Sequence, residues 1–307
     1  MTKELHHRNI HNEKYDFKSL VKEFPKLTSY VSENKYGDLS VDFSDANAVL
    51  TLNQALLALH YSVKDWTIPK GNLCPPIPGR VDYLHYIADL LTQQNGDTPP
   101  VGPKIKGLDI GAGTGCIYPI LGNSVYGWKF VATDIHSDSI NHCKKILNAN
   151  PTLKKNIKMR YQESADHIFQ GILKQDEHFD FTMCNPPFYS SLLEAKSASE
   201  RKVKNLNINR DKKGHAANKI KVGDVSNFGG KDYELWCPGG EMSFISKMIE
   251  QSVQVKDQCR WFTTLVSNKN NLPELNKQLR NLKTKEVRTI KMRHGKKIVH
   301  ILAWKFR

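Results

Sequence analysis

A short apolar run ends abruptly at four residues suited to holding a planar amino group. The run Phe179–Cys184 is followed by Asn185, Pro186, Pro187 and Phe188. Two successive prolines cannot continue a central strand, because neither has a backbone N–H for the ladder. This Asn-Pro-Pro-Phe quartet could simply cap the strand, since Asn-Pro and Pro-Pro are common in turns. On these four residues alone, the structural and the functional interpretations stand equal.

The functional interpretation of the quartet is a specific one. An exocyclic amine on a nucleic-acid base is a poor nucleophile, because its lone pair is delocalised into the ring. The Asn185 side-chain oxygen and the Pro186 carbonyl can each accept one N–H, which favours the pyramidal nitrogen that develops during attack on a methyl group. The prolines stiffen this carbonyl, and Phe188 offers a face on which a base can stack. The quartet therefore predicts catalysis of methyl transfer to an amino group.

A glycine-rich turn upstream predicts a site for an adenosine-containing cofactor. The sequence LDIGAGTG places Asp109, Gly111, Gly113 and Gly115 at the end of an apolar strand. Glycines there allow a tight turn and close approach of the backbone to a ligand. Asp134 ends the next predicted strand, where a carboxylate can accept hydrogen bonds from both ribose hydroxyls. Because no Lys-Ser/Thr pair follows the glycines, a nucleotide triphosphatase loop is excluded, and the pattern fits NAD or S-adenosylmethionine.

Seven strands are predicted to position these residues. Beyond residue 104, apolar runs alternate with segments of helical periodicity, which predicts an α/β fold with an open, mostly parallel sheet and a closing hairpin. The predicted strands are residues 104–110, 128–135, 156–162, 179–185, 259–267, 286–292 and 298–306. The predicted helices between them are residues 116–123, 137–150, 164–175, 239–255 and 272–282. Such an arrangement is the Rossmann-like seven-stranded sheet of class I methyltransferases.

The first third of the chain predicts a separate helical module. Apolar residues recur at three- and four-residue spacing in residues 18–27, 45–61 and 80–94. Residues 1–98 are therefore expected to form a helical module that binds RNA or covers the site. The proline-rich residues 68–80 are expected to be irregular, and residues 95–103 to be a connection. Residues 104–307 then form the methyltransferase domain, with a basic insertion at residues 190–230.

The distribution of charge predicts a polyanionic partner. The net charge is +14, and the isoelectric point lies near 9.4. Residues 196–221 hold nine basic and two acidic side chains, and residues 283–297 hold seven basic and one acidic side chain. Almost all of the excess positive charge is therefore concentrated in two segments. A charged run is usually only a solvated surface, but this concentration favours nucleic acid as the partner.

Several classes of protein are not expected from the composition. No run approaches the roughly twenty apolar residues of a membrane span, and the polar N-terminal residues do not form a signal sequence. The six cysteines are scattered, without a C-x-x-C pair or a histidine at ligand spacing. They predict reduced thiols of a cytoplasmic protein rather than a zinc site.

Longer motifs carry a resemblance to a known family. The chain contains CPPIPGR, MCNPPF, SERKVKNL, NFGG and ELWCPGGE. With these motifs it resembles, over essentially its whole length, the bacterial 23S ribosomal RNA adenine-N6-methyltransferases of the large subunit. It is more distantly similar to the eukaryotic U6 small nuclear RNA adenosine-N6-methyltransferase. The resemblance implies S-adenosyl-L-methionine as methyl donor and S-adenosyl-L-homocysteine as product. It also implies 23S ribosomal RNA, or a precursor of the large ribosomal subunit, as partner.

The resemblance also implies roles for individual residues. It places around the cofactor the residues Arg80, Gly111, Gly115, Asp134, Ser164 and Asn185. It suggests Arg8 as a contact to RNA. Arg201, Lys202 and Lys204 follow the quartet in the basic insertion and are expected to contact phosphates. The Lys, Asn and Gly content of the insertion predicts a loop that is mobile until RNA binds.

Other functions remain open at this point. Methylation of another structured RNA, such as a small nuclear RNA, fits the same residues. Protein glutamine methyltransferases share Asn-Pro-Pro followed by an aromatic residue, but the +14 charge and the basic insertion argue against them. The quartet does not exclude a DNA adenine methyltransferase. An RNA-binding protein without catalysis is disfavoured by the intact quartet.

Overall fold

The contacts of the chain divide it into two compact units. The computed structural model describes residues 5–34, 36–92, 98–211, 232–294 and 297–307. Unit 1 consists of Met1–Lys14, Ile77–Pro186 and Glu241–Arg307, and unit 2 of Tyr15–Pro76 and Pro187–Gly240. The division therefore differs from the boundary expected near residue 98. Residues 77–92 form a helix that packs on the helices and strands of unit 1.

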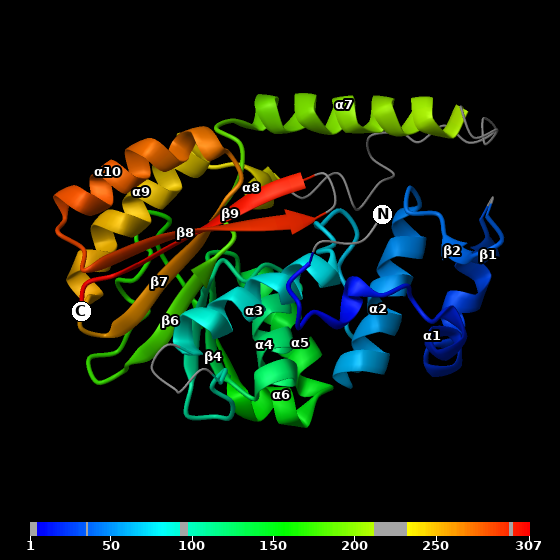
Figure 1. The fold of residues 1–307 in the computed structure, drawn as a ribbon, viewed down its shortest axis with the longest axis horizontal. Coiled ribbons are helices and arrows are strands. Elements are labelled where there is room, and N and C mark those ends of the chain that lie inside the picture. Colours follow the sequence, from blue (N-terminus) through cyan, green and yellow to red (C-terminus); the bar gives the residue numbers. More distant parts are fainter. Residues whose placement is uncertain (1–4, 35, 93–97, 212–231, 295–296) are drawn as a thin grey trace. The chain divides into compact units, whose positions relative to one another are not determined.

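Unit 1 is built on a seven-stranded sheet (Figure 1). Its strands are β3 (Lys106–Ile110), β4 (Lys129–Asp134), β5 (Ile157–Tyr161), β6 (Phe179–Cys184), β7 (Cys259–Val266), β8 (Glu286–His294) and β9 (Lys297–Lys305). Their order is β5-β4-β3-β6-β7-β9-β8. The first five strands are parallel, and β9 lies antiparallel between β7 and β8. This order confirms the predicted class I methyltransferase sheet with its closing hairpin.

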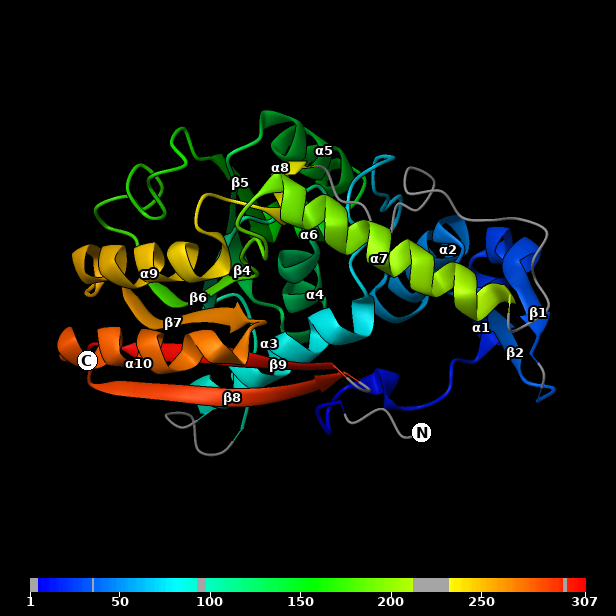
Figure 2. The same cartoon turned by 90° about the horizontal axis from the view of Figure 1, so that it is seen from above.

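Helices cover both faces of this sheet (Figure 2). The helices of unit 1 are α3 (Ile77–Thr92), α4 (Ile117–Tyr126), α5 (Ser137–Asn148), α6 (Pro151–Asn156), α9 (Gly240–Ser252) and α10 (Leu272–Asn281). Helices α3 and α4 pack on each other, and α4 and α5 pack on β4. On the other face, α9 and α10 bury their apolar side chains against β7 and β9. Packing of helices on both faces explains why β3, β4, β6 and β7 are buried along most of their length rather than at alternate residues.

Successive residues of β4 pack on opposite faces of the sheet. Phe130 contacts Phe181 of β6 with ring centroids 5.8 Å apart. Any Cβ at Gly107 would lie 2.5 Å from Phe181 and 2.6 Å from Phe130, and one at Gly122 of α4 would lie 2.5 Å from Phe130. The next residue, Val131, belongs to the core cluster on the opposite face. The two glycines therefore let α4 and β3 approach the aromatic rings closely.

Unit 2 is smaller and contains the basic insertion. Its elements are α1 (Phe17–Glu23), β1 (Val31–Glu33), β2 (Leu39–Val41), α2 (Ala46–Tyr61), α7 (Leu192–Asp211) and α8 (Asp232–Leu235). Helix α1 packs on α2, and the Asp45 side chain caps α2 by accepting the N–H of Asn47. The β1–β2 hairpin was not expected. Its turn depends on the Asn34 side chain, which accepts the N–H groups of Tyr36 and Asp38, and on Gly37 at φ +75°.

The prediction of a mobile loop after the quartet is wrong for residues 192–211, which form helix α7. The Ser191 hydroxyl accepts the N–H of Glu194, and the Glu194 carboxylate accepts the N–H of Ser190. This reciprocal pattern resembles a capping box, and the spacing S-x-x-E was visible in the sequence. Glycine and proline are absent from this stretch, whereas leucine, alanine, lysine and glutamate favour a helix. Residues 212–231 of the insertion lie outside the described residues.

The predicted helix over residues 164–175 is also wrong. These residues form turns, and Gly171 adopts φ +80°, which interrupts a helix. The Gln162 side chain donates to the Gln170 carbonyl, and the Gln251 side chain accepts the N–H of Ile168. The apolar side chains of the segment still join the core. Burial therefore satisfies the apolar periodicity, while the backbone forms separate turns such as Ile172 N–H to the Phe169 carbonyl, and side chains add the other hydrogen bonds.

Two further boundaries differ from the predictions. Helix α3 begins at Ile77, inside the segment expected to be irregular. Pro78 lies in its first turn, where the missing backbone N–H is not needed by the helix. The short helix α6 begins with Pro151 for the same reason and was not predicted.

Candidate active site

The register of the sheet brings the predicted site residues to one edge. Ile110 at the end of β3 pairs with Thr133 of β4 on one side and with Cys184 of β6 on the other. The residues that follow these strand ends therefore lie at neighbouring positions, about 5 Å apart from strand to strand. They include Gly111 and Asn185. The strand order also reverses at β3, and ligands of open α/β sheets bind outside the carboxyl ends of strands at such a point.

The glycine turn leaves open space for a ligand. Gly111 and Gly113 adopt φ +74° and +61°, and a Cβ at either position would meet nothing within 4 Å. The N–H groups of Gly111 and Ala112 both donate to the Thr133 carbonyl, at 3.0 and 2.8 Å. The turn is thereby anchored to β4, with its backbone exposed above. Gly115 is buried at the end of the turn.

Asp134 organises this turn. Its Oδ2 accepts the N–H of Gly113 and its Oδ1 accepts the N–H of His136, each at 2.9 Å. The side chain is buried, and burial raises the pKa of its carboxyl while the two backbone hydrogen bonds oppose the increase. The carboxylate therefore does two things in this structure. It joins the glycine turn to the start of α5, and each of its oxygens keeps a further lone pair for a ligand.

Two further ionisable side chains, Asp109 and Arg80, lie beside the glycine turn. Arg80 donates from Nη1 to the Tyr118 hydroxyl at 2.5 Å, and its guanidinium lies 5.3 Å from the centroid of that ring. Asp109 is 1% exposed, and neither of its carboxylate oxygens has a hydrogen-bond partner among the described residues. Burial is the main cause that raises the pKa of Asp109 to about 8, and the negative charge of nearby Asp134 adds to the increase. The positive charge of Arg80 lowers the pKa of Asp109 and so opposes both effects.

Helix α3 is fixed to the sheet by a residue one turn beyond Arg80. The Tyr83 hydroxyl is hydrogen-bonded to Thr263 Oγ1 at 2.7 Å, and Thr263 Oγ1 donates to the Thr182 carbonyl at 2.7 Å. Tyr83 is fully buried, and it also interacts with the backbone of Cys184, directly before Asn185. Residues three apart on a helix share a face. Tyr83 therefore holds Arg80 toward the edge at which β6 ends.

The polar atoms around the turn fit S-adenosylmethionine. Three side chains there have buried atoms without a hydrogen-bond partner among the described residues, namely both oxygens of Asp109, Arg80 Nε and Thr114 Oγ1. Buried polar groups normally have partners, so these atoms indicate a ligand site. A carboxyl group that ionises when a cation binds, and a guanidinium near it, suit the ammonium and the carboxylate of the methionine part. The Asp134 oxygens match the ribose hydroxyls.

The raised pKa of Asp109 predicts a pH dependence of cofactor binding. The cationic groups of S-adenosylmethionine favour the ionised carboxylate, so binding releases a proton while Asp109 is protonated in the free protein. Affinity is expected to rise with pH below about 8, by up to about tenfold per unit. Calorimetry at pH 6, 7 and 8 in buffers of different ionisation enthalpy measures both affinity and proton release. In Asp109→Asn both pH effects are expected to vanish; if they persist, another group titrates.

Ser164 lies in the turn after β5, at the same edge of the sheet. The N–H of Gln162 donates to the Asp134 carbonyl, and the Gln162 side chain accepts the N–H of Ser164 at 3.2 Å. The Ser164 hydroxyl accepts the N–H of Asp166 at 3.2 Å. Gln162 thus links Ser164 to the Asp134 region. A contact of Ser164 with the cofactor stays a prediction.

The quartet begins in unit 1 and continues into unit 2. Asn185 is half-buried and Pro186 is buried directly after β6, and Pro187 is the first residue of unit 2. Within unit 2, the N–H groups of Phe188 and Tyr189 both donate to the Leu235 carbonyl at 3.0 Å. Leu235 belongs to the motif ELWCPGGE, far along the chain. The aromatic end of the quartet is therefore held by that motif.

The sequence did not single out Glu234, which supports this arrangement. Its carboxylate accepts from Asn72 Nδ2 at 2.9 Å through Oε1 and from the Leu73 N–H at 3.0 Å through Oε2. Asn53 of α2 donates to the Pro75 carbonyl at 3.1 Å and so fixes the same proline-rich segment. All of these residues belong to unit 2. The sequence signal for this contact was in two motifs, because ELWCPGGE begins with Glu234 and CPPIPGR begins directly after Leu73.

Replacement of Glu234 is expected to affect transfer more than cofactor binding. Glu234→Ala removes both acceptors for Asn72 and Leu73, so the segment that carries the Leu235 carbonyl holds Phe188 less firmly, and the transfer rate is expected to fall about tenfold. Glu234→Gln keeps one acceptor oxygen, so the transfer rate of this variant is expected to fall less. Single-turnover rates and the affinity for S-adenosylmethionine check this. Equal rates for both variants and the parent would rule out the positioning role.

Of the residues predicted to bind RNA, one is engaged in contacts within unit 1 and two are exposed. The Arg8 guanidinium forms an ion pair with Asp89 at 2.6 Å and donates to the His85 carbonyl at 2.9 Å, so it is engaged inside unit 1. Arg201 and Lys204 are exposed on α7. The side chain of Lys202 lies outside the described part of the structure. Contacts of these residues with RNA stay predictions.

Within the described ranges, two kinds of feature are not found. No helix there combines the length and apolar character that crossing a membrane requires. No group of three or more His, Cys, Asp or Glu side chains in those ranges is placed to hold a metal ion.

Fold and site together define a class of enzyme, the class I methyltransferases that use S-adenosylmethionine. The strand order, the glycine turn with its acidic partner, and the quartet at the end of the adjacent strand all belong to that class. A family model described as RNA methyltransferase matches residues 1–307, and the chain belongs to this family.

Individual relatives agree with this assignment. The Ribosomal RNA large subunit methyltransferase F of Photobacterium profundum is 51% identical, with 99% of this chain and 92% of the relative covered. The protein of the same name from Flavobacterium johnsoniae is 48% identical, with 98% and 93% covered. The hMettl16 catalytic domain in complex with MAT2A 3'UTR hairpin 1 is similar with TM-score 0.79 and 30% identity, covering 99% of this chain and 96% of that one. The N-terminal domain of human METTL16 in complex with SAH is similar with TM-score 0.75 and 28% identity, covering 99% of both chains.

Proposed function

We propose that this enzyme transfers the methyl group of S-adenosylmethionine to the exocyclic N6 of one adenine in 23S ribosomal RNA. The substrate is the RNA itself or a precursor of the large ribosomal subunit, and the reaction takes place in the cytoplasm. The observation that carries the proposal is the position of Asn185, at the strand end beside the glycine turn. Relatives about half identical over nearly the whole chain, each named Ribosomal RNA large subunit methyltransferase F, support the choice of RNA.

In this mechanism the residues of the chain orient the two reactants. Arg80, Asp109 and Asp134 hold the cofactor at the glycine turn, and S-adenosylmethionine supplies an electrophilic methyl group. The Asn185 oxygen and the Pro186 carbonyl accept the two N–H groups of the adenine amine. With the cofactor bound, the nitrogen lone pair would form the N–C bond as the methyl–sulfur bond breaks and its electrons return to sulfur. The surplus N–H proton would then pass to solvent water. The amine becomes acidic as it is alkylated, so a charged general base is not required.

Incubation with radiolabelled S-adenosylmethionine tests the proposal. The substrates are a full-length 23S ribosomal RNA transcript, large-subunit precursor particles, a structured small nuclear RNA and a glutamine-containing protein extract. Digestion of the RNA to nucleosides is expected to show label in N6-methyladenosine from 23S RNA. Label only in the small nuclear RNA would favour the related activity on another structured RNA. Label only in glutamine would overturn the proposal.

We also expect the start of the basic insertion to contribute to RNA binding. Replacement of Arg201, Lys202 and Lys204 by alanine should weaken binding of 23S RNA and reduce the slope of log affinity against log salt by about two to three. Affinity for S-adenosylmethionine should hardly change, because α7 does not form the glycine turn. Filter binding from 50 to 200 mM salt measures the slope. If the triple variant shows an unchanged salt slope and unchanged RNA affinity, these residues form a solvated surface that does not contact RNA.

A further inference from the structure

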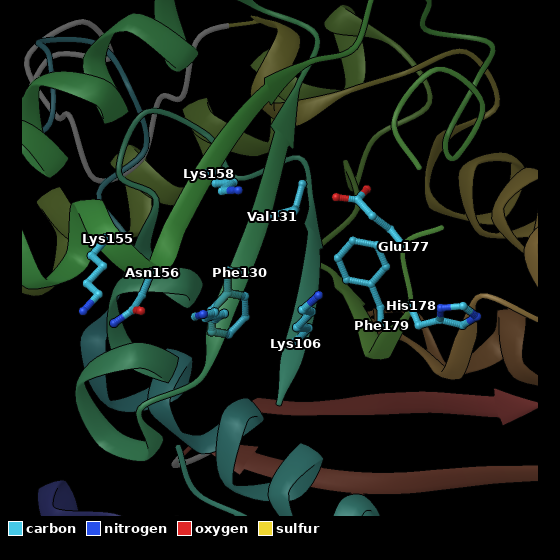
Figure 3. Close-up of a pocket in the computed structure, with 10 residues that line it drawn as sticks. Lys106, Phe130, Val131, Lys155, Asn156, Lys158, Glu177, His178 and Phe179 are labelled. Atoms are coloured by element: carbon cyan, nitrogen blue, oxygen red, sulfur yellow. The ribbon is translucent and has the colours of Figure 1, made fainter. Parts of the chain in front are cut away.

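A pocket opens at the amino edge of the sheet, opposite to the candidate active site (Figure 3). Its volume is about 220 Å³. Lys106 and Lys129, the first residues of β3 and β4, line it together with the start of β6. Strand β3 has five residues, so about 13 Å separates this pocket from the glycine turn. The pocket is therefore distinct from the cofactor site.

Four lysines surround this pocket. They are Lys106, Lys129, Lys155 and Lys158. One carboxylate lies beside them, because Asp180 accepts the backbone N–H of Lys106 at 2.8 Å, and it offsets only part of their charge. Three of the lysines are exposed and Lys129 is half-buried. Within the part of the chain that the structure describes, none of the four forms an ion pair or a side-chain hydrogen bond. Four ammonium groups with one nearby carboxylate leave an excess of positive charge, which favours binding of an anion.

The one acidic residue that lines the pocket does not neutralise these lysines. Arg160 binds both oxygens of Glu177, from Nη2 to Oε1 at 2.5 Å and from Nη1 to Oε2 at 2.6 Å. This bidentate contact lowers the pKa of Glu177 to about 2. The charge of Glu177 is therefore already balanced by Arg160. Figure 3 shows Glu177 and His178 on one side of the pocket, and Lys155 and Asn156 on the other.

The two aromatic side chains that line the pocket are themselves buried. Phe130 and Phe179 line it and are 2% and 4% exposed. Figure 3 shows Phe130 between Lys155 and Lys106. Lysine is a flexible point charge and suits phosphate contacts that do not depend on base sequence. Because both rings are almost fully buried, a nucleotide segment would meet the lysines through its phosphates and would not stack on the rings.

We propose that this pocket binds the phosphate backbone of the substrate RNA away from the target adenine. The inference rests on the proposed function, since an RNA of ribosomal size is long enough to contact both edges of the sheet. The lysines come from β3, β4, β5 and the end of α6, so they follow an extended anion over several strands. The site adds affinity and orientation without reading sequence.

Lysine acetylation in the presence of RNA tests this contact on the unmodified protein. The protein is treated with an amine-acetylating reagent, alone, with a full-length 23S RNA transcript, or with inorganic phosphate, and the modified lysines are identified by mass spectrometry. RNA is expected to protect Lys106, Lys155 and Lys158 at least fivefold relative to exposed Lys144, Lys145 and Lys256. Equal modification with and without RNA would overturn the proposal. Equal protection by inorganic phosphate would replace it with a small-anion site.

Matched triple variants provide the quantitative test. Lys106→Ala/Lys155→Ala/Lys158→Ala is expected to weaken binding of 23S RNA about tenfold and to reduce the salt slope by about two to three. The control Lys144→Ala/Lys145→Ala/Lys256→Ala removes the same charge elsewhere and is expected to bind like the parent. Unchanged affinity for S-adenosylmethionine shows that each variant is folded. Equal RNA binding by both variants contradicts the proposal.

Methylation by the parent separates this inference from the proposed function. If the parent methylates 23S RNA but its pocket lysines are not protected, the function stands and the second contact is wrong. If the parent does not methylate 23S RNA, the proposed function is wrong, whatever the lysines show.

Discussion

Replacement of Asn185 by alanine is expected to lower the rate of methyl transfer by about 10²-fold or more and to leave the affinity for S-adenosylmethionine largely unchanged. The physical reason is the loss of a fixed acceptor for an amine N–H in the transition state. Asn185 directly follows Cys184, whose strand pairs with β3, so its backbone does not move freely. Single-turnover transfer to 23S RNA with saturating cofactor measures the rate. Calorimetry measures the affinity.

The control for Asn185 is an asparagine of the same unit outside the site. Asn141 is exposed on α5, and Asn141→Ala is expected to behave like the parent in both measurements. A transfer rate of Asn185→Ala within a few-fold of the parent would return the quartet to the role of a strand cap. A large loss of cofactor affinity would place Asn185 in cofactor binding instead.

Replacement of Asp134 by alanine is expected to weaken S-adenosylmethionine binding about tenfold to a hundredfold, as the loss of hydrogen bonds to a charged acceptor does. The structure adds a second reason, because the same carboxylate accepts the N–H groups of Gly113 and His136. The variant is therefore also expected to melt at a lower temperature without cofactor. Calorimetry and thermal unfolding measure the two effects. Asp138→Ala, exposed on the first turn of α5, is the matched control.

A deoxyribose analogue of the cofactor separates the two roles of Asp134. The parent is expected to bind S-adenosylmethionine more tightly than its 2′-deoxy analogue, because Asp134 accepts from the hydroxyl. The alanine variant is expected to bind both equally. If the variant discriminates as the parent does, Asp134 only organises the turn, and the ribose is recognised elsewhere.

The sequence predicted the sheet well because its signals are local. Apolar runs of five to nine residues, separated by helical segments, mark β3 to β9, and the order of such elements leaves few topologies for an open parallel sheet. Asp109, Gly111 and Asp134 were identifiable because a glycine turn needs a particular backbone conformation. The helix predicted over residues 164–175 failed because periodicity reports burial and not backbone hydrogen bonds. There the backbone forms only separate turns, and the side chains of Gln162 and Gln251 supply further hydrogen bonds.

By itself, the sequence determined the class of the sheet, the cofactor turn and the quartet. Each of these depends on residues next to one another in the chain, whose conformations are restricted locally. Only the tertiary structure decided which distant residues support them. Glu234 contacts Asn72 across more than 160 residues, and the pocket lysines come from four separate elements. Such contacts depend on how the elements pack and on the register of the strands, and no pattern within a single segment contains that information.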